Sequence, residues 1–438
     1  MRRTLYTQLV AWKNSLDRKP LILEGARQVG KTWLIKEFGR NEYDNLVYVN
    51  CADEDFAKSL FLKNLKPDRI IRDIVANTRQ RIEPGKTLIF FDEIQEAPNG
   101  ISSLKYFCEN AGEHHVIAAG SLLGVVHHPG ESYPVGKVNI LKLHPMSFEE
   151  FLYAKGYDTL AEMLADCDWG SIEVLKDTLE DLLRQYYYVG GMPEVVMNWV
   201  VKEDVLNIRK IQNRIIASYA NDISKHAPEE SERIRMVWNS IPSQLAKENK
   251  KFIYGNVKKG SRAREFEMSI QWLVDAGLVH KIYRCKTPEM PLKFYEDFNA
   301  FKLYLLDVGL LGALAGASPA QMIVSNDVFK EYKGAFAENY VLQQLMLDEE
   351  LSISYFSKEN SNIEIDFLVQ TFNRLIPIEV KAEENVKSKS LRQFITIDHV
   401  GKHLKGLRCS MKPYIDQDWM ENIPLYGITG YINHSKTL

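Results

Sequence analysis

A glycine-rich loop near the N-terminus limits the fold of this chain more than any other feature. The loop covers residues 25–32 and has the pattern Gly-x-x-x-x-Gly-Lys-Thr. An apolar run at residues 21–23 comes directly before it, and a helical pattern at residues 33–38 follows it. A strand, a glycine-rich turn and a helix in this order form an anion site, because backbone N–H groups and the helix N-terminus then point at a phosphate. The chain is therefore predicted to bind a nucleotide here.

Two side chains of this loop are predicted to act on the phosphates of ATP. Lys31 would reach the β and γ phosphates, and the Thr32 hydroxyl would ligate Mg²⁺. A glycine-rich turn without a ligand is the alternative, but it would not explain why strand, spacing, lysine and threonine all agree. The predicted nucleotide-binding residues are Gly25, Ala26, Arg27, Gln28, Val29, Gly30, Lys31 and Thr32.

A second motif, further along the chain, supports the first. The apolar residues 88–91 are followed by Asp92 and Glu93. An uninterrupted apolar run fits a parallel strand that is buried on both faces, and acids at its carboxyl end lie where such sheets bind ligands. Asp92 is expected to hold Mg²⁺, directly or through water, and Glu93 to orient or deprotonate the attacking water. Hydrolysis of ATP is therefore predicted.

A third strand is predicted at residues 115–120, and Ser121 follows it. A small polar residue at this place in P-loop ATPases contacts the γ-phosphate or the attacking water, so Ser121 is a candidate sensor. The alternative, which is compatible with the first, is a helix N-cap before Leu122. The predicted catalytic residues are Lys31, Glu93 and Ser121.

The composition is that of a globular protein with more than one domain. The 438 residues are 45% hydrophobic and 26% charged, with a formal net charge of −3. Any contact with nucleic acid must therefore come from a local basic patch. The 5 cysteines are scattered without a Cys-x-x-Cys pair, which predicts free thiols in the reducing cytoplasm. No apolar run approaches the roughly 18–20 residues of a membrane span, so no membrane partner is expected.

The order of the elements predicts an α/β chain in four parts. Residues 1–150 alternate apolar runs with helical patterns, which indicates a P-loop NTPase core with a parallel sheet. Residues 151–225 are mostly helical and would form a lid beside the nucleotide. Residues 226–330 have the element order of a winged helix, and residues 331–438 that of an α/β nuclease-like domain.

The predicted winged helix carries a cluster of basic residues. A helix is expected at residues 261–276, and an alternating strand at residues 279–284. The basic residues are Lys250, Lys251, Lys258, Lys259 and Arg262. Contact with DNA phosphates is one interpretation. The other is a solvated surface on a module that is structural or binds a protein, and the sequence leaves both open.

A second constellation of charged residues lies near the C-terminus. Glu338 falls in a helical segment and Asp366 in a strand, and the next strand carries Glu379 and Lys381 on one face. Asp366 and Glu379 offer hard oxygen ligands for Mg²⁺ or Mn²⁺, and a neighbouring lysine can activate water. All four residues are candidates for metal-dependent phosphodiester cleavage. The alternative is a strand whose charged residues alternate on an exposed face.

Segments that span nearly the whole chain carry a family resemblance. They are residues 25–32, 88–93, 119–121, 143–151, 190–194, 302–310 and 378–381. By these segments the chain resembles bacterial and archaeal AAA-like P-loop ATPases that have a conserved C-terminal domain of unknown function. The resemblance implies ATP binding, a winged-helix segment, and a C-terminal domain similar to restriction endonucleases.

One position departs from that family. Its members often have Gly-Arg where this chain has Gly136-Lys137. If the arginine acts as a finger across a homo-oligomer, Lys137 is a poorer one, because an ammonium cannot make the planar bidentate contact of a guanidinium. No other arginine finger can be assigned from the sequence.

Two functions from different classes are predicted. The first is an ATPase, with ATP and Mg²⁺ as cofactors, whose hydrolysis is coupled to DNA binding or processing by the C-terminal parts. The second is an ATP-dependent regulatory switch with a non-cutting C-terminal domain that binds a protein. The expected partners are ATP, DNA for the first function, and further copies of the chain.

Overall fold

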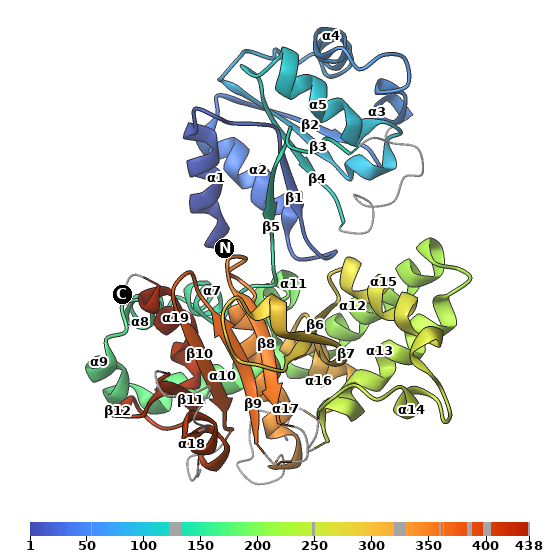
Figure 1. The fold of residues 1–438 in the computed structure, drawn as a ribbon. Helices are drawn as coiled ribbons and strands as arrows, with labels where there is room; N and C mark the ends of the chain where they lie inside the picture. The colour runs from blue at the N-terminus through green and yellow to red at the C-terminus, as the bar shows by residue number, and fades with distance from the viewer. Residues whose placement is uncertain are drawn as a thin grey trace. The chain divides into compact units, whose positions relative to one another are not determined.

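The computed structural model describes residues 1–53, 55–121, 133–247, 250–318, 330–358, 361, 363–382, 388–396 and 404–436. The chain forms two compact units, shown in Figure 1. One unit consists of Arg2–His144 with Asp275–Gly277, and the other of Pro145–Val274 with Leu278–Leu438 and Met1. Among the helices of the described residues, none combines the length and the hydrophobicity needed to cross a membrane.

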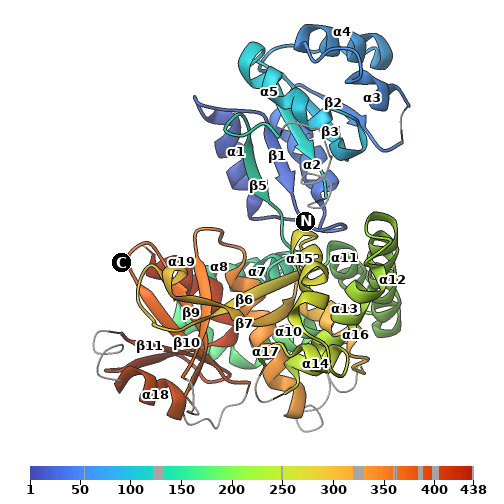
Figure 2. The same ribbon diagram turned by 45° about the vertical axis from the view of Figure 1, so that its right-hand side comes forward.

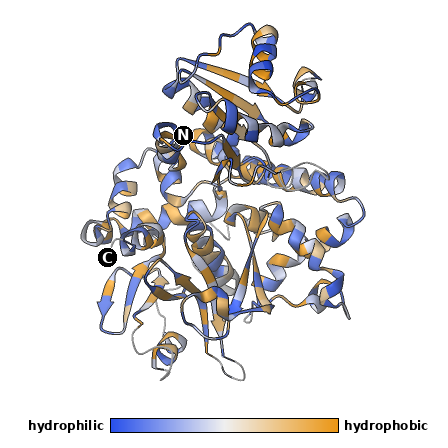
Figure 3. Cartoon of the chain, turned by 45° about the horizontal axis from the view of Figure 1, so that its top comes forward, coloured by the Kyte–Doolittle hydropathy of each residue, from blue (hydrophilic) through white to orange (hydrophobic). Residues whose placement is uncertain are grey.

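The first unit contains a parallel sheet of five strands in the order β2-β3-β4-β1-β5. The strands are β1 (Leu21–Glu24), β2 (Asn45–Asn50), β3 (Thr87–Asp92), β4 (His115–Ala119) and β5 (Asn139–Lys142). Every residue of β3 and β4 is buried, as their continuous apolar runs predict for central strands. Figure 3 shows how hydrophobic and hydrophilic residues are distributed along the helices and strands of the chain. The prediction of an α/β unit with a parallel sheet is confirmed.

Helices connect the strands of this sheet. They are α1 (Leu5–Asn14), α2 (Lys31–Glu42), α3 (Asp55–Leu60), α4 (Pro67–Thr78), the 3-10 helix η1 (Ile94–Glu96) and α5 (Gly100–Asn110). Helix α2 begins directly after the glycine-rich loop and packs against β2, β3 and β4. Because the strands are parallel, the loops after β1, β2, β3 and β4 all lie at the carboxyl edge of the sheet.

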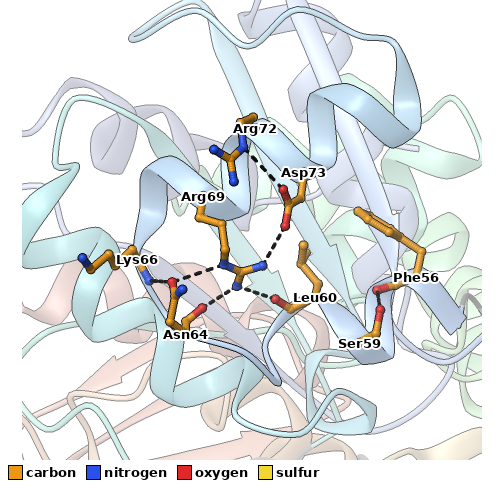
Figure 4. Close-up of polar contacts among 8 residues, drawn as sticks. All are labelled: Phe56, Ser59, Leu60, Asn64, Lys66, Arg69, Arg72 and Asp73. Atoms are coloured by element: carbon orange, nitrogen blue, oxygen red, sulfur yellow. Dashed lines mark hydrogen bonds and ion pairs between the residues drawn. The ribbon is translucent and has the colours of Figure 1, made fainter.

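One arginine closes the connection between α3 and α4, as Figure 4 shows. Arg69 donates to the carbonyl oxygen of Leu60 at 2.6 Å and to Oδ1 of Asn64 at 3.2 Å. Its guanidinium also pairs with Oδ2 of Asp73, one helical turn later, at 2.8 Å. These contacts fix the connection between α3 and α4.

The second unit contains a sheet of eight strands in the order β12-β13-β11-β10-β9-β8-β6-β7. The strands are β6 (Val279–Cys285), β7 (Glu296–Leu305), β8 (Ser352–Ser357), β9 (Glu364–Gln370), β10 (Leu375–Val380), β11 (Gly406–Ser410), β12 (Ile415–Gln417) and β13 (Met420–Pro424). Strands β8, β9 and β10 are antiparallel neighbours, and β11 runs parallel to β10.

The strands of two predicted parts share this sheet. β6 pairs with β7, and Figure 2 shows these two strands side by side. β6 also pairs in parallel with β8, at Arg284 and Tyr355. β6 and β7 lie in the part predicted as a winged helix, and β8 in the part predicted as nuclease-like. The third and fourth predicted parts are therefore joined by backbone hydrogen bonds. The four-part division of the chain stays a prediction.

The remaining elements of the second unit are helical. They are α7 (Phe148–Ala154), α8 (Asp158–Ala165), α9 (Trp169–Val174), α10 (Lys176–Val189), α11 (Pro193–Lys202), α12 (Val205–His226), α13 (Ser231–Leu245), α14 (Tyr254–Val257), α15 (Glu267–Asp275), α16 (Val308–Leu314), α17 (Lys330–Leu345), α18 (Lys389–Thr396) and α19 (Ile428–Ser435). Helix α7 starts with a capping box between Ser147 and Glu150. Leu391 and Phe394 of α18 belong to the hydrophobic core of the sheet.

Three of the segments that carry the family resemblance meet around Asp307. Its buried carboxylate caps α16 by accepting from Leu310 N at 2.9 Å, and it also accepts from Gly191 N at 2.6 Å. A Cβ atom on Gly190 would lie 2.3 Å from Oδ1 of Asp307, and one on Gly191 would lie 2.1 Å from the Met146 oxygen. Glycine at both positions therefore allows the close approach of these segments, because any Cβ atom there would clash.

Candidate functional site

The backbone of the glycine-rich loop includes left-handed conformations, which glycine adopts more readily than other residues. Gly30 has φ of 97° and Gln28 has φ of 67°, both left-handed. A Cβ atom on Gly25 would lie 2.4 Å from the carbonyl oxygen of Leu143. Side chains at positions 25 and 30 would therefore strain the loop directly before α2.

Lys31 lies inside the loop that it is predicted to serve. Its side chain is buried, and Nζ donates to the carbonyl oxygens of Gly25 at 2.8 Å and Ala26 at 2.9 Å. Burial lowers the pKa of Lys31 to about 8, although the charges of Glu93 and Asp92 act in the opposite direction. The ammonium is thus held where an anionic ligand of the loop would compete for it.

Thr32 and Asp92 meet as the prediction of a Mg²⁺ site requires. The Thr32 hydroxyl donates to Oδ2 of Asp92 at 2.8 Å, and the Tyr48 hydroxyl donates to the same oxygen at 3.1 Å. Burial raises the pKa of Asp92, while the hydrogen bond from Thr32 lowers it. A hydroxyl beside a carboxylate is a fitting oxygen donor pair for Mg²⁺. Tyr48 was not predicted, because only the pairing of β2 with β3 reveals it.

Glu93 is turned away from the strand direction by a left-handed backbone with φ of 49°. Its Oε2 accepts from Nε2 of Gln95 at 2.5 Å. Gln95 is itself buried in η1, so it can orient the carboxylate. Gln95 was not predicted as a site residue, because it lies two residues after the acidic pair and belongs to no motif.

Ser121 follows a strand that lies between the two motif-bearing strands. Ala119, two residues earlier, pairs with Leu23 of β1 and with Asp92 of β3. Ser121 is therefore at the carboxyl edge between the loop and Asp92, and its role as a sensor stays a prediction. Leu122, which would begin the alternative helix, lies outside the described residues.

A buried arginine beneath the loop was missed by the sequence patterns. Arg3, 5% exposed, donates from Nη1 to the Val29 oxygen at 2.9 Å and from Nη2 to the His144 oxygen at 2.6 Å. It thus links a loop carbonyl to the segment that follows β5. No motif marks Arg3, because it precedes α1 and reaches the loop only through the fold.

The C-terminal carboxylates come together around a hairpin. Asp366 lies on β9, and its Oδ2 accepts from the Val380 N–H of β10 at 2.8 Å. Lys381 follows β10, and its Nζ lies 3.2 Å from Oε1 of Glu379. The hairpin thus places Asp366 beside the Glu-x-Lys segment, and the buried Glu379 does not fit the alternative of an exposed charged face.

Glu338 reaches the same place from α17. Asn339, its neighbour, exchanges two hydrogen bonds with the backbone of Leu305 on β7, at 2.9 and 3.0 Å. The buried Glu338 carboxylate then accepts from the Tyr304 hydroxyl at 3.1 Å and forms an ion pair with Lys250. Lys250 and Tyr304 were not predicted as site residues, since both lie in the segment assigned to the winged helix.

Charges of opposite sign balance one another in this cluster. Burial raises the pKa of Asp366, and the charge of Glu338 raises it further, against the lysines at 302, 250 and 381. Burial also acts to raise the pKa of Glu338, but Lys250 and Lys302 outweigh it and the pKa is lowered. Lys302 is fully buried and lies 2.6 Å from Oε1 of Glu364.

The predicted metal site at Asp366 and Glu379 is not established by this geometry. Within the described ranges, no three His, Cys, Asp or Glu side chains are placed to share a metal ion. Lysine ammonium groups approach the carboxylates instead.

Lys137 lies at the position where members of the resembling family often have arginine. Its Nζ pairs with Oε1 of Glu109 at 3.0 Å.

Comparison with known families assigns one part of the chain and leaves two without a function. Residues 17–152 match the family described as an AAA domain. Residues 180–321 and 333–427 match two families described as domains of unknown function, DUF8612 and DUF4143. No curated protein matches the chain.

Solved structures resemble the chain only distantly. The ORC1 protein of Aeropyrum pernix in complex with DNA has 14% identity and a TM-score of 0.27, over 72% of this chain and 90% of that one. The RuvB Holliday junction branch migration motor of Thermotoga maritima has 15% identity and a TM-score of 0.29, over 64% and 86%. Drosophila ORC bound to DNA has 16% identity and a TM-score of 0.27, over 71% and 94%. TM-scores this low do not establish a common overall fold.

Proposed function

We propose, from the premise that this chain is a P-loop ATPase with an AAA domain, that its ATP hydrolysis is coupled to DNA binding or processing by the second unit. The hydrogen bond between Thr32 and Asp92 carries the catalytic part of the proposal. It brings together the two oxygen donors that a Mg²⁺–ATP site needs, at the end of a loop already shaped for phosphate.

The residues of the first unit divide the reaction among them. Lys31 binds the β and γ phosphates, and Thr32 and Asp92 hold Mg²⁺. When bound, Mg²⁺ neutralises phosphate charge. Glu93, oriented by Gln95, takes a proton from the water that attacks the γ-phosphorus. The bond from this phosphorus to the β–γ bridging oxygen breaks, and ADP leaves with that oxygen. Ser121 donates a hydrogen bond to the γ-phosphate or to that water.

An exposed basic segment supports the coupling to DNA. Lys251, Lys258, Lys259 and Arg264 are exposed around α14 and before α15. These exposed cations lie close together in the sequence of a chain with net charge −3, and they would supply the local positive charge that phosphate contact requires. Binding through such a patch should weaken steeply with salt and depend little on DNA sequence.

The element order near the C-terminus supports a nuclease-like core. Helix α17 precedes the antiparallel strands β8, β9 and β10, and after α18 the strand β11 runs parallel to β10. Asp366 lies on the second of these strands, and the Glu-x-Lys segment on the third. Carboxylates from a helix and two strands beside a lysine suit metal-dependent phosphodiester chemistry.

ATP turnover measured with and without duplex DNA tests the coupling. In Mg²⁺, DNA should stimulate wild-type turnover, and Glu93→Gln should retain ATP binding but lose turnover by about a hundredfold or more. Lys258→Glu combined with Lys259→Glu should keep basal turnover and lose the stimulation. A wild-type rate that DNA never changes, at any salt concentration, would contradict the coupling.

A regulatory switch is the second candidate. The lysines that neutralise Glu338, Asp366 and Glu379 favour it, because a cluster balanced in this way can be purely structural. In that case ATP binding sets the conformation, and the second unit binds a protein without cutting DNA. Tight ATP binding with negligible turnover and no response to DNA would support the switch.

A further inference from the structure

We propose that Lys250 is the internal counter-ion of the C-terminal carboxylate site, so that a divalent cation can bind at Glu338 and Asp366 only when Lys250 withdraws. This inference rests on the proposed nuclease-like site and names what controls it. Carboxylates are the ligand type that Mg²⁺ or Mn²⁺ prefers, but the Glu338 carboxylate is already paired with the ammonium of Lys250.

The contacts of Glu338 show how the ammonium is held. Oε1 pairs with Lys250, and Oε2 accepts from the Tyr304 hydroxyl at 3.1 Å. The side chains of Glu338 and Lys250 are only 4% and 15% exposed, so water screens their attraction weakly. Lys250 also passes over Gly334, where a Cβ atom would lie 3.8 Å from its Nζ. The Nζ of Lys250 thus lies within van der Waals reach of α17, one turn before Glu338.

Lys250 differs from the other lysines of the cluster in its origin. Lys302 lies on β7 and pairs with Glu364, and Lys381 directly follows β10 and pairs with Glu379. Lys250 comes from the irregular segment before α14, 88 residues from Glu338 in sequence. Its backbone belongs to no strand, whereas Lys302 lies in β7 and Lys381 N donates to the Cys409 oxygen of β11 at 2.8 Å.

This origin also suggests what could draw Lys250 away. Lys250 is next to the exposed Lys251 and in the basic segment proposed to contact DNA. A phosphate can replace the carboxylate as the partner of its ammonium, because one anion is exchanged for another. The freed Glu338 then has a negative charge beside Asp366, and a divalent cation can take the vacated place. DNA binding and metal binding are thereby coupled.

Mn²⁺ binding, followed by the loss of the free-ion electron paramagnetic resonance signal, tests the inference without any activity assay. The full chain is used without nucleotide, so that any Mn²⁺ bound near Thr32 is common to all variants. Lys250→Met should bind Mn²⁺ about tenfold more tightly than wild type or better, because one of three nearby positive charges is gone. Lys251→Met, which removes an exposed neighbouring charge, should behave as wild type.

The double variant Lys250→Met with Glu338→Gln locates the effect. It should lose the gain in Mn²⁺ affinity, because the vacated carboxylate is then absent. Since Lys250→Met leaves Glu338 buried and unpaired, its melting temperature should fall, and Mn²⁺ should restore it more than it raises that of wild type. Equal Mn²⁺ affinity and equal Mn²⁺-induced melting shifts in wild type, Lys250→Met and Lys251→Met would overturn the inference.

The outcome is distinct from that of the proposed function. Tighter Mn²⁺ binding by Lys250→Met without DNA cleavage by any variant would retain the counter-ion and reject cutting. Cleavage of DNA by wild type with unchanged Mn²⁺ affinity in Lys250→Met would reject the counter-ion and retain cutting.

Discussion

At the scale of residues, the proposed nucleotide binding depends most directly on the charge of Lys31. Burial lowers its pKa to about 8 in the nucleotide-free chain. ATP affinity should therefore fall as pH rises from about 7 to about 9, since a neutral amine no longer attracts phosphate. Lys31→Ala should lose binding at every pH, whereas Arg40→Ala, an exposed change on the same helix, should not. Titration with a fluorescent ATP analogue measures both, and a flat wild-type profile would contradict the argument.

The second prediction at the scale of residues concerns Arg3, which donates a hydrogen bond to the Val29 oxygen of the loop. Arg3→Met removes the hydrogen bonds to Val29 and His144, and the ATP dissociation constant should rise about tenfold. Arg3→Lys keeps the charge but can reach only one carbonyl, so an intermediate constant is expected. Arg40→Met is the matched control. If Arg3→Met changes only the melting temperature, with ATP affinity intact, Arg3 has no role in positioning the loop.

At the scale of elements, Asp307 joins α16 to the Gly190-Gly191 turn. Asp307→Asn places an amide N–H₂ against backbone donors, and should lower the free energy of unfolding by about 1–3 kcal/mol. Asp204→Asn is the matched control, because Asp204 caps α12 at an exposed position. Denaturant unfolding of both variants measures the difference. A loss as small as that of the control would show that the turn does not depend on Asp307.

Asp307 also predicts a pH dependence of stability. Burial raises its pKa from 3.8 to about 6 in the folded chain. The folded state therefore keeps a proton that the unfolded state has released, and the contribution of Asp307 decreases as pH rises from about 4 to about 6. The difference between wild type and Asp307→Asn should change in that window and be constant above it. A difference that is constant from about pH 4 would contradict the raised pKa.

At the scale of the whole molecule, the eight-stranded sheet decides which fragments can fold. A fragment of residues 331–438 would lose β6 and expose the edge of β8, together with the docking partner of Asn339. It should aggregate, because unpaired strand edges template association. A fragment of residues 145–438 keeps the sheet whole and should elute as a folded species in size-exclusion chromatography. A soluble, cooperatively folded 331–438 fragment would contradict this expectation.

The sequence by itself predicted the candidate nucleotide site. Residues 25–32, Asp92 and Glu93 could be assigned because a strand, its following loop and the next helix are contiguous, so spacing along the chain equals placement in space. The parallel sheet followed from uninterrupted apolar runs, which only a strand buried on both faces tolerates. The hairpin that sets Asp366 beside Lys381 was equally local.

Only the tertiary structure decided the contacts between distant segments. Arg3 beneath the loop, Tyr48 on Asp92, and Lys250 on Glu338 carry no motif. The pairing of β6 with β8 joins two parts that the sequence patterns had separated. Neither strand has a residue pattern that predicts this pairing. The physical reason is that apolar periodicity records which face of an element is buried, and not which other element covers it. Burial then makes these polar contacts strong, because water no longer competes for the charges.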